Sequence, residues 1–184
     1  RFLLESVADL RESLRRLGTD LLIRVGEPAP VLRTLVDELD VERLCFVEEP
    51  GTEERRRERE VEEAVPATLR SLPPETLLGI DDPRHHAREL PEVFSAFRRD
   101  AERNLEIAPP KAPPRSLVAL EIPTGFDRGD LPALGDLGLQ EGDPETRAAL
   151  DFRGGESAGL DRIESWMHRG DHLGRYKLTR NGML

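Results

Sequence analysis

Apolar residues recur every three or four positions in several stretches of the chain, and this spacing predicts helices that bury one face. The first helix is already running at Arg1 and stops before Gly18, a residue type that commonly ends helices. Its apolar positions are Phe2, Leu3, Val7, Leu10, Leu14 and Leu17. Apolar or charged residues at helical spacing predict further helices over residues 30–39, 53–65, 90–105 and 155–166.

Short apolar runs predict three strands, at Leu21–Val25, Leu44–Val47 and Ala67–Leu72. They alternate with predicted helices, an order typical of an α/β domain with a doubly wound parallel sheet. Thr52 is predicted to cap the helix that follows the second strand. Cys45 is predicted to be buried within that strand and to play no nucleophilic role, and as the only cysteine it excludes an internal disulfide.

Proline pairs interrupt this pattern after Leu72. They lie at Pro73-Pro74, Pro109-Pro110 and Pro113-Pro114, and only the stretch 90–105 between them is predicted to be helical. A long, mostly irregular segment inside a protein usually links two domains or wraps one of them. Residues 73–151 are therefore expected to form a connector.

The charge of the chain limits its partners. A formal net charge of −10 over 184 residues opposes phosphate binding by the chain as a whole, because such binding depends on Lys and Arg. No apolar run approaches the roughly 18 residues of a membrane span, and nothing resembles a signal peptide. We expect a cytoplasmic protein with no membrane contact. The run 53–63 mixes both signs of charge and is predicted to be a solvated helix face.

Some residue patterns suggest sites but favour simpler interpretations. His168 and His172 have a metal-compatible spacing, yet Gly170 interrupts them and no further ligands cluster nearby, so exposed histidines and no metal site are predicted. Gly154-Gly155 lacks the spacing of a phosphate loop and is predicted to lead into a helix. Trp166 is predicted to be a core residue of that helix.

Five segments resemble the DASH-type cryptochromes of the photolyase/cryptochrome family, in the family's order. They are RFLLESVADLRESLRRLGTDLLIRVGEP at the start, ELPEVFSAFRRDAER (Glu89–Arg103), GDLPALGDLGL (Gly129–Leu139), FRGGESAGLDRIESWM (Phe152–Met167) and YKLTRNGML (Tyr176–Leu184). The resemblance covers essentially the whole chain. It implies a partial α/β antenna domain over residues 1–72, the connector over 73–151, and the start of an all-α FAD-binding domain over 152–184.

The resemblance implies a blue-light flavoprotein that binds FAD and a 5,10-methenyltetrahydrofolate antenna chromophore and takes part in DNA repair. The parent would be a deoxyribodipyrimidine photolyase, a lyase in which excited reduced FAD splits cyclobutane pyrimidine dimers, for DASH members in single-stranded DNA. Damaged DNA would bind the helical domain, and no catalytic residue is assigned in this chain. Two alternatives remain open: a blue-light signalling cryptochrome without repair activity, and a nonenzymatic nucleotide-binding α/β module.

Two residues match cofactor sites of the family. Tyr176 resembles the tyrosine that opens the flavin-binding segment, where a phenol can donate to an FAD phosphate oxygen; a tyrosine packed at a helix end is the alternative. Glu53 resembles the acidic residue of the antenna site, where a carboxylate accepts hydrogen bonds from a pterin. A first-turn glutamate that only complements the helix dipole is its alternative, and Glu49 and Glu54 compete for the antenna role.

Relative to the family pattern, the sequence lacks the first strand and helix before Arg1 and the helical domain after Leu184. That first strand would occupy the centre of a doubly wound sheet. Without it, neighbouring strands would lose hydrogen-bonding partners and leave apolar faces uncovered. We therefore expect that residues 1–184 alone do not fold to a native monomer.

Overall fold

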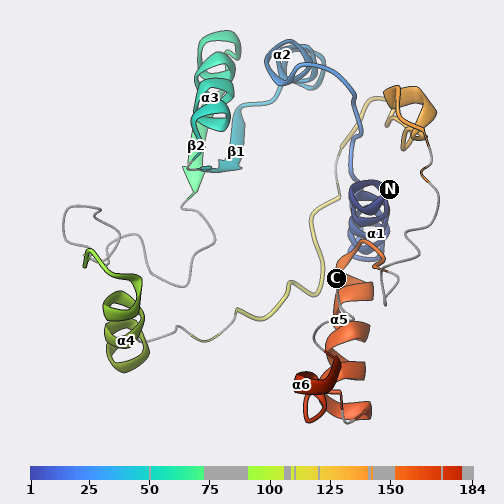
Figure 1. Cartoon of the computed structure of the whole chain (residues 1–184). Coiled ribbons are helices and arrows are strands. Elements are labelled where there is room, and N and C mark those ends of the chain that lie inside the picture. Colours follow the sequence, from blue (N-terminus) through green and yellow to red (C-terminus); the bar gives the residue numbers. More distant parts are fainter. Residues whose placement is uncertain are drawn as a thin grey trace. The chain divides into compact units, whose positions relative to one another are not determined.

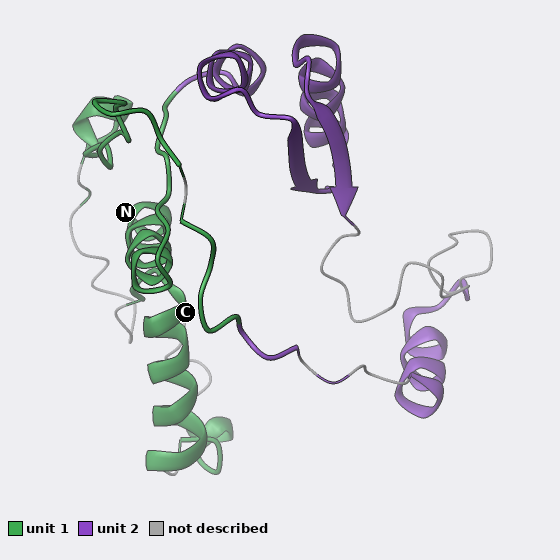
Figure 2. Ribbon diagram, turned by 180° about the vertical axis from the view of Figure 1, so that it is seen from behind, with its two compact units in different colours: residues 1–25, 114–184 green, residues 26–113 purple. Residues whose placement is uncertain are grey.

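The computed structural model of the chain describes residues 1–49, 51–72, 91–105, 109, 111–119, 121–140, 142, 152–170 and 172–179. These residues form two compact units, each of which is considered by itself (Figure 2). Unit 1 combines residues 1–25 with residues 114–184, and unit 2 spans residues 26–113. Within the described ranges no helix is long and apolar enough to cross a membrane.

Unit 2 contains a small parallel sheet (Figure 1). Strand β1 (Arg43–Val47) pairs in parallel with β2 (Thr68–Leu72), with Arg43 opposite Thr68 and Val47 opposite Leu72. Helix α2 (Pro28–Leu39) precedes β1, α3 (Thr52–Ala64) joins the two strands, and α4 (Phe94–Asn104) follows later. The predicted α/β class and parallel pairing are confirmed. The predicted helix 90–105 is confirmed over α4, and its first residue lies outside the described residues.

The core of unit 2 lies between α2, α3 and one face of the sheet. Val36, Val61 and Val65 are its buried members, and the partly buried apolar residues around them are Ala29, Leu32, Val41, Leu44, Ala67 and Leu69. Leu44 packs on this core, whereas Cys45 is exposed. The prediction that Cys45 is buried is wrong, because successive side chains of a strand point to opposite faces and the core formed with α2 and α3 covers the Leu44 face.

Local sequence explains where the helices of unit 2 begin. Pro28 occupies the first position of α2, where a missing N–H costs no helical hydrogen bond and the ring fixes a helical φ. Helix α3 begins at Thr52 itself and its N-cap is Gly51, so the prediction of Thr52 as the cap is wrong by one residue. Acidic residues at Glu53 and Glu54 complement the dipole at this helix start.

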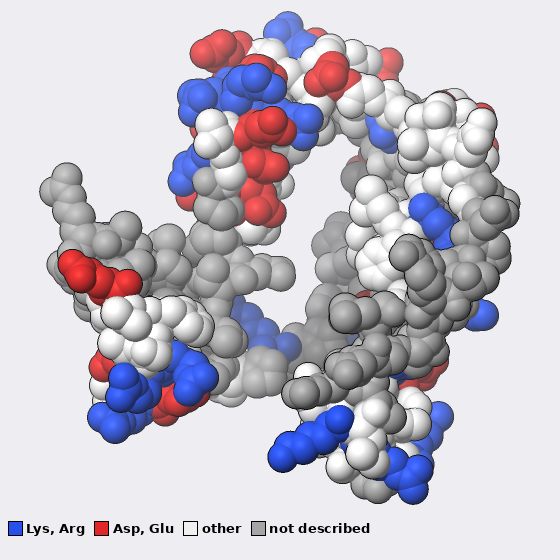
Figure 3. Space-filling model, viewed as in Figure 1, with Lys and Arg blue, Asp and Glu red and all other residues white. Residues whose placement is uncertain are grey.

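Helix α3 carries the charged run that was predicted to be solvated. Its charged residues are exposed apart from the partly buried Glu58, and Figure 3 shows both signs of charge interspersed over this helix. An exposed ion pair joins Arg56 to Glu60 at 3.6 Å. Exposed pairs of this kind contribute about 0–1 kcal/mol each to the free energy of unfolding. The main effect of the charged run is therefore to make the outer face of α3 hydrophilic.

Unit 1 contains α1 (Phe2–Arg16), the short 3₁₀ turn η2 (Gly135–Leu137), α5 (Glu156–Glu164), the π-helical turn η3 (Ser165–Arg169) and α6 (Tyr176–Thr179). The helices predicted to start near Arg1 and Gly155 are confirmed. Leu21–Val25 was predicted as a strand, and this is wrong. A strand needs a hydrogen-bonded neighbour. Among the described residues, this segment makes one backbone–backbone bond to another part of unit 1, from the Ile23 N–H to the Arg128 carbonyl at 2.9 Å.

One face of α1 binds the segment that leads into α5. Glu5 accepts a hydrogen bond from the backbone N–H of Gly154 (2.7 Å), and Ser6 accepts one from the N–H of Gly155 (2.9 Å). A Cβ on Gly154 would collide with the carbonyl oxygen of Phe2, and Gly155 has φ +105°. The glycine pair is a helix lead-in, as predicted, and it also lets the chain approach α1 closely.

Asp9 caps α5 from one turn further along α1. Its carboxylate accepts hydrogen bonds from the hydroxyl of Ser157 (2.7 Å) and from the N–H of the same residue (3.1 Å), 148 positions away in the sequence. The hydroxyl bond and then the N–H bond hold the pKa of Asp9 below its ordinary value, although burial opposes them. Since the first N–H groups of a helix have no partner within it, these bonds stabilise the start of α5.

Asp20 gathers three arginines of unit 1. It accepts hydrogen bonds from Arg11 Nε (3.0 Å), Arg15 Nε (3.1 Å) and Arg128 Nη1 (3.0 Å), and its side chain is only 5% exposed. Burial raises the pKa of Asp20, but the bonds from Arg11, the Leu21 N–H, Arg128 and Arg15 outweigh burial and hold that pKa well below its usual range. The cluster ties α1 to the segment that contains Arg128.

Gly155→Ala is predicted to destabilise the full-length protein, whereas the control Gly159→Ala is not. A side chain at φ +105° is strained by about 1–2 kcal/mol, and its Cβ would lie 2.8 Å from Cβ of Asp9. Gly159 lies inside α5 with open space around it, where alanine is favoured by about 0.5–1 kcal/mol. Urea unfolding measures both variants, and equal midpoints would contradict the close approach described for the lead-in.

Asp20→Asn is predicted to lower the free energy of unfolding of the full-length protein by about 1–3 kcal/mol at pH 7, because the arginines lose a charged acceptor. Since the pKa of Asp20 is lowered by folding, its contribution is complete above about pH 4, the ordinary range of a carboxyl, and is lost as the pH falls below that range. Unfolding of wild type and variant between pH 7 and pH 3 should show a shrinking difference. A constant difference over this range would disprove the assignment.

Candidate functional site

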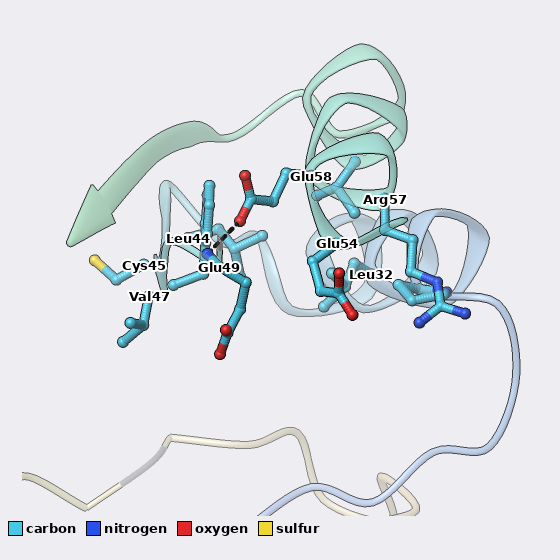
Figure 4. A pocket seen from close by; sticks show the side chains of 11 residues that line it. Leu32, Leu44, Cys45, Val47, Glu49, Glu54, Arg57 and Glu58 are labelled. Atoms are coloured by element: carbon cyan, nitrogen blue, oxygen red, sulfur yellow. Dashed lines mark hydrogen bonds between the residues drawn. The ribbon is translucent and has the colours of Figure 1, made fainter. Parts of the chain in front are cut away.

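A cavity of about 370 Å³ opens beside the C-terminal end of β1 (Figure 4). It is lined mainly by apolar side chains, with three glutamates and one arginine. The lining residues are Pro28, Leu32, Leu44, Cys45, Phe46, Val47, Glu49, Glu54, Arg57, Glu58 and Val61. Because ligands of open α/β sheets commonly bind at the carboxyl ends of the strands, this cavity is the candidate binding site of unit 2.

Glu49 lies in the cavity wall where the sheet ends. The ladder between the strands closes with a hydrogen bond from the Glu48 N–H to the Leu72 carbonyl at 2.9 Å. One residue later, the Glu49 N–H donates instead to the Glu58 side chain, with 3.0 Å between the nitrogen and Oε1 (Figure 4). Glu58 of α3 thus supplies the acceptor for the backbone N–H that follows the last ladder bond.

Glu54 reaches the cavity from the first turn of α3. Its carboxylate lies close to the backbone of Gly51, where a Cβ at position 51 would displace the end of this flexible side chain. The carboxylate lies near the N-terminus of α3, where the helix dipole favours negative charge. In Figure 4 the side chains of Glu49 and Glu54 both extend toward the lower part of the view.

The structure separates the three glutamates considered for the antenna site. Glu53 is exposed on α3 and is not among the residues that line the cavity, whereas Glu49 and Glu54 both line it. The geometry therefore favours the two competing residues, and the role of Glu53 stays a prediction.

The lining determines which ligand chemistry the cavity suits. Glu49, Glu54 and Glu58 against Arg57 give a formal charge of −2. Ionised carboxylates accept hydrogen bonds and cannot donate them, and apolar walls favour the faces of a flat ring. The cavity suits a neutral or cationic ring with N–H donors better than it suits a phosphate.

Tyr176 begins the four-residue helix α6 in unit 1. Its backbone N–H donates to the Leu173 carbonyl at 3.2 Å, and the residue as a whole is 45% exposed. The phenol is therefore accessible to a ligand. Residues 180–184, which complete the run YKLTRNGML, lie outside the described residues.

Trp166 lies in η3 and is half-buried. Its ring stacks with that of His172 at 5.9 Å between centroids, and the Arg162 guanidinium lies 5.7 Å from its centroid. The predicted core position is wrong, because a cationic and a polar aromatic side chain pack against the indole. His168 and His172 are exposed, as predicted. In the part of the chain that the structure describes, no three metal-ligating side chains come together.

Comparison with known sequences shows to which family the chain belongs. The sequence model of the DNA photolyase family matches residues 1–115, which is more than half of the chain. The chain belongs to the DNA photolyase family. The resemblance noted from the five sequence segments is thereby confirmed.

Curated relatives of this photolyase-family chain bear the name cryptochrome DASH. One from Gloeobacter violaceus is 43% identical over 187 residues, and the match covers 100% of this chain and 37% of that protein. Another, from Natronomonas pharaonis, is 38% identical over 183 residues and is matched over 98% of this chain and 38% of its own length. The chain thus spans little more than a third of the length of these relatives.

Solved structures share the photolyase fold. A cryptochrome from Synechocystis superposes with a TM-score of 0.82 at 29% identity, over 98% of this chain and 37% of that one. A class III photolyase from Agrobacterium tumefaciens gives a TM-score of 0.67 at 20% identity, over 90% of this chain and 34% of that one, and supports the fold alone.

Sequence analysis missed two arrangements in this photolyase-family chain. It assigned no role to Glu58, although the spacing of Glu54 and Glu58 places both on one helix face. Glu58 could not be singled out from the sequence, because it lies in a run of charged residues and the others in that run are exposed. It also missed that Asp9 binds the start of α5, since no local pattern connects residues 148 positions apart.

Proposed function

We propose that the full-length protein is a blue-light-dependent flavoprotein that splits cyclobutane pyrimidine dimers, a deoxyribodipyrimidine photolyase of the DASH type. The similarity of the whole chain to cryptochromes DASH carries this proposal, together with the family match over residues 1–115. Catalysis and the binding of damaged DNA are proposed to reside in the part of the relatives' length that this chain does not span. Single-stranded DNA is the preferred substrate, because a lesion there leaves its stack at lower cost.

FAD is the proposed catalytic cofactor. When it is bound, reduced and excited, it supplies the electron that opens the dimer and recovers that electron after the ring has split. Tyr176 has an accessible phenol, which suits a hydrogen bond to a phosphate oxygen. We propose this role for Tyr176, and Tyr176→Phe, which removes only the hydroxyl, is expected to retain less flavin on purification.

The antenna 5,10-methenyltetrahydrofolate is the proposed ligand of the cavity beside β1. The carboxylates of Glu49 and Glu54 suit the N–H and amino groups of a pterin, and the apolar walls suit its ring faces. When bound, the antenna supplies absorption in the blue. Glu53 is a third candidate, because it lies in the same first turn of α3 as Glu54.

A blue-light signalling cryptochrome without repair activity is the second candidate function. The relatives and one similar solved structure are named cryptochromes, and the same cavity would serve an antenna in either case. A nonenzymatic nucleotide-binding module is less favoured, because the acidic lining of the cavity opposes phosphate.

The full-length protein is predicted to show flavin absorption bands and to restore a dimer-containing single-stranded oligonucleotide under blue light. The measurement is the loss of dimers during illumination, with the same mixture kept in darkness as the control. Flavin bands without repair would indicate the light sensor. Absence of flavin bands would favour the nucleotide-binding module.

Glu49→Gln in the full-length protein is predicted to weaken binding of 5,10-methenyltetrahydrofolate by about 10- to 100-fold, because a charged acceptor of a ligand hydrogen bond is lost. Glu53→Gln compares the two candidates. Because Glu53 lies outside the cavity lining, the dissociation constant of this variant should change less than about threefold. Fluorescence titration measures both. A larger loss for Glu53→Gln than for Glu49→Gln would return the antenna role to Glu53.

A further inference from the structure

We propose that Glu58 is a positioning residue of the antenna cavity: its carboxylate fixes the backbone of Glu49, so that the Glu49 side chain is held in the cavity wall. This inference rests on the proposed function, in which the cavity binds a pterin. Glu58 itself is not proposed to contact the pterin.

The first support is the hydrogen bonding at the end of β1. The parallel ladder provides a carbonyl acceptor for the Glu48 N–H, from Leu72 at 2.9 Å. For the next N–H, that of Glu49, the acceptor is Glu58 Oε1 at 3.0 Å. Without this acceptor the Glu49 N–H would be left to water, and the backbone of Glu49 would lose a contact that fixes its orientation.

The second support is the environment of Glu58. Its side chain is only 16% exposed, in a helix whose other charged residues are exposed. Burial of a carboxylate is unfavourable unless hydrogen bonds compensate it. A hydrogen bond from a backbone N–H to a charged acceptor of this kind is stronger than one between neutral groups.

The third support is Arg55, which forms an ion pair with Glu48, the residue before Glu49. Arg55 lies 3.7 Å from the Glu48 carboxylate and 3.9 Å from that of Glu58. One turn of α3 therefore holds two consecutive residues at the strand exit, Glu48 through its side chain and Glu49 through its backbone. The direction of Glu49 follows from α3 as well as from the sheet.

Titration of 5,10-methenyltetrahydrofolate into the full-length protein tests the inference. Glu58→Ala removes the acceptor and is expected to weaken binding about tenfold, the effect of losing one hydrogen bond that orients a ligand group. Glu58→Gln keeps a carbonyl oxygen at the same reach and should bind within about threefold of wild type. Glu62→Ala, an exposed position on the same helix, should leave the dissociation constant unchanged.

Hydrogen exchange of the peptide that contains Glu49 provides a second readout, which an effect on ligand contact alone would not move. Exchange is expected to accelerate in Glu58→Ala but not in Glu58→Gln or Glu62→Ala. Should Glu58→Ala fail to fold, Glu58→Met replaces it, because methionine keeps the length of the side chain without the carboxylate.

The outcomes separate the inference from the proposed function. Weak binding by Glu58→Ala with rescue by Glu58→Gln supports the positioning role. Unchanged affinity in Glu58→Ala, while Glu49→Gln still binds weakly, overturns the positioning role and leaves the antenna proposal intact. Equal losses in Glu58→Ala and Glu58→Gln also overturn it, because charge rather than the hydrogen bond would then matter. If wild type itself does not bind the pterin, the proposed antenna function fails.

Discussion

The parallel ladder between β1 and β2 is the constraint on which the candidate site depends. Its register sets Val47 opposite Leu72, and its last hydrogen bond ends at Glu48. The chain leaves the sheet after that bond, and α3 returns beside it, where Glu58 accepts the hydrogen bond from the Glu49 N–H. Acidic side chains thereby gather at the end of a strand over an apolar wall. This combination of acceptors and apolar surface suits a flat ring with N–H donors, such as the pterin proposed as its ligand.

Unit 1 is held together by contacts between segments far apart in the sequence. Asp9 of α1 supplies hydrogen-bond acceptors to the start of α5, and Gly155 allows the approach because a side chain there would be strained. Asp20 gathers arginines from α1 and from the segment near Arg128. Each of these contacts is polar and directional, so it fixes position as well as adding stability. Helix α5, which precedes Tyr176 in the chain, begins at the contacts that Asp9 makes.

Periodicity in the sequence predicted the helices and the parallel sheet well, because burial of one face leaves a repeating pattern. It could not predict that Cys45 faces away from the helices, since an apolar run has no polar residue to mark the outer face. Nor could it show that Leu21–Val25 forms no strand, because pairing depends on a distant neighbour. At the candidate site, glutamates after β1 were recognisable as acceptors. Which of them lines the cavity depends on how α3 returns beside the end of β1, and no local pattern in the sequence records that return.

The central claim is that the end of β1 forms a pterin site whose direction is set by α3. A crystal structure of the full-length protein with 5,10-methenyltetrahydrofolate tests it most directly. The account predicts a pterin in the cavity, with its N–H donors within about 3.2 Å of the carboxylate of Glu49 or Glu54, and Glu58 still bonded to the Glu49 backbone. A pterin bound elsewhere, with this cavity empty, would contradict the account.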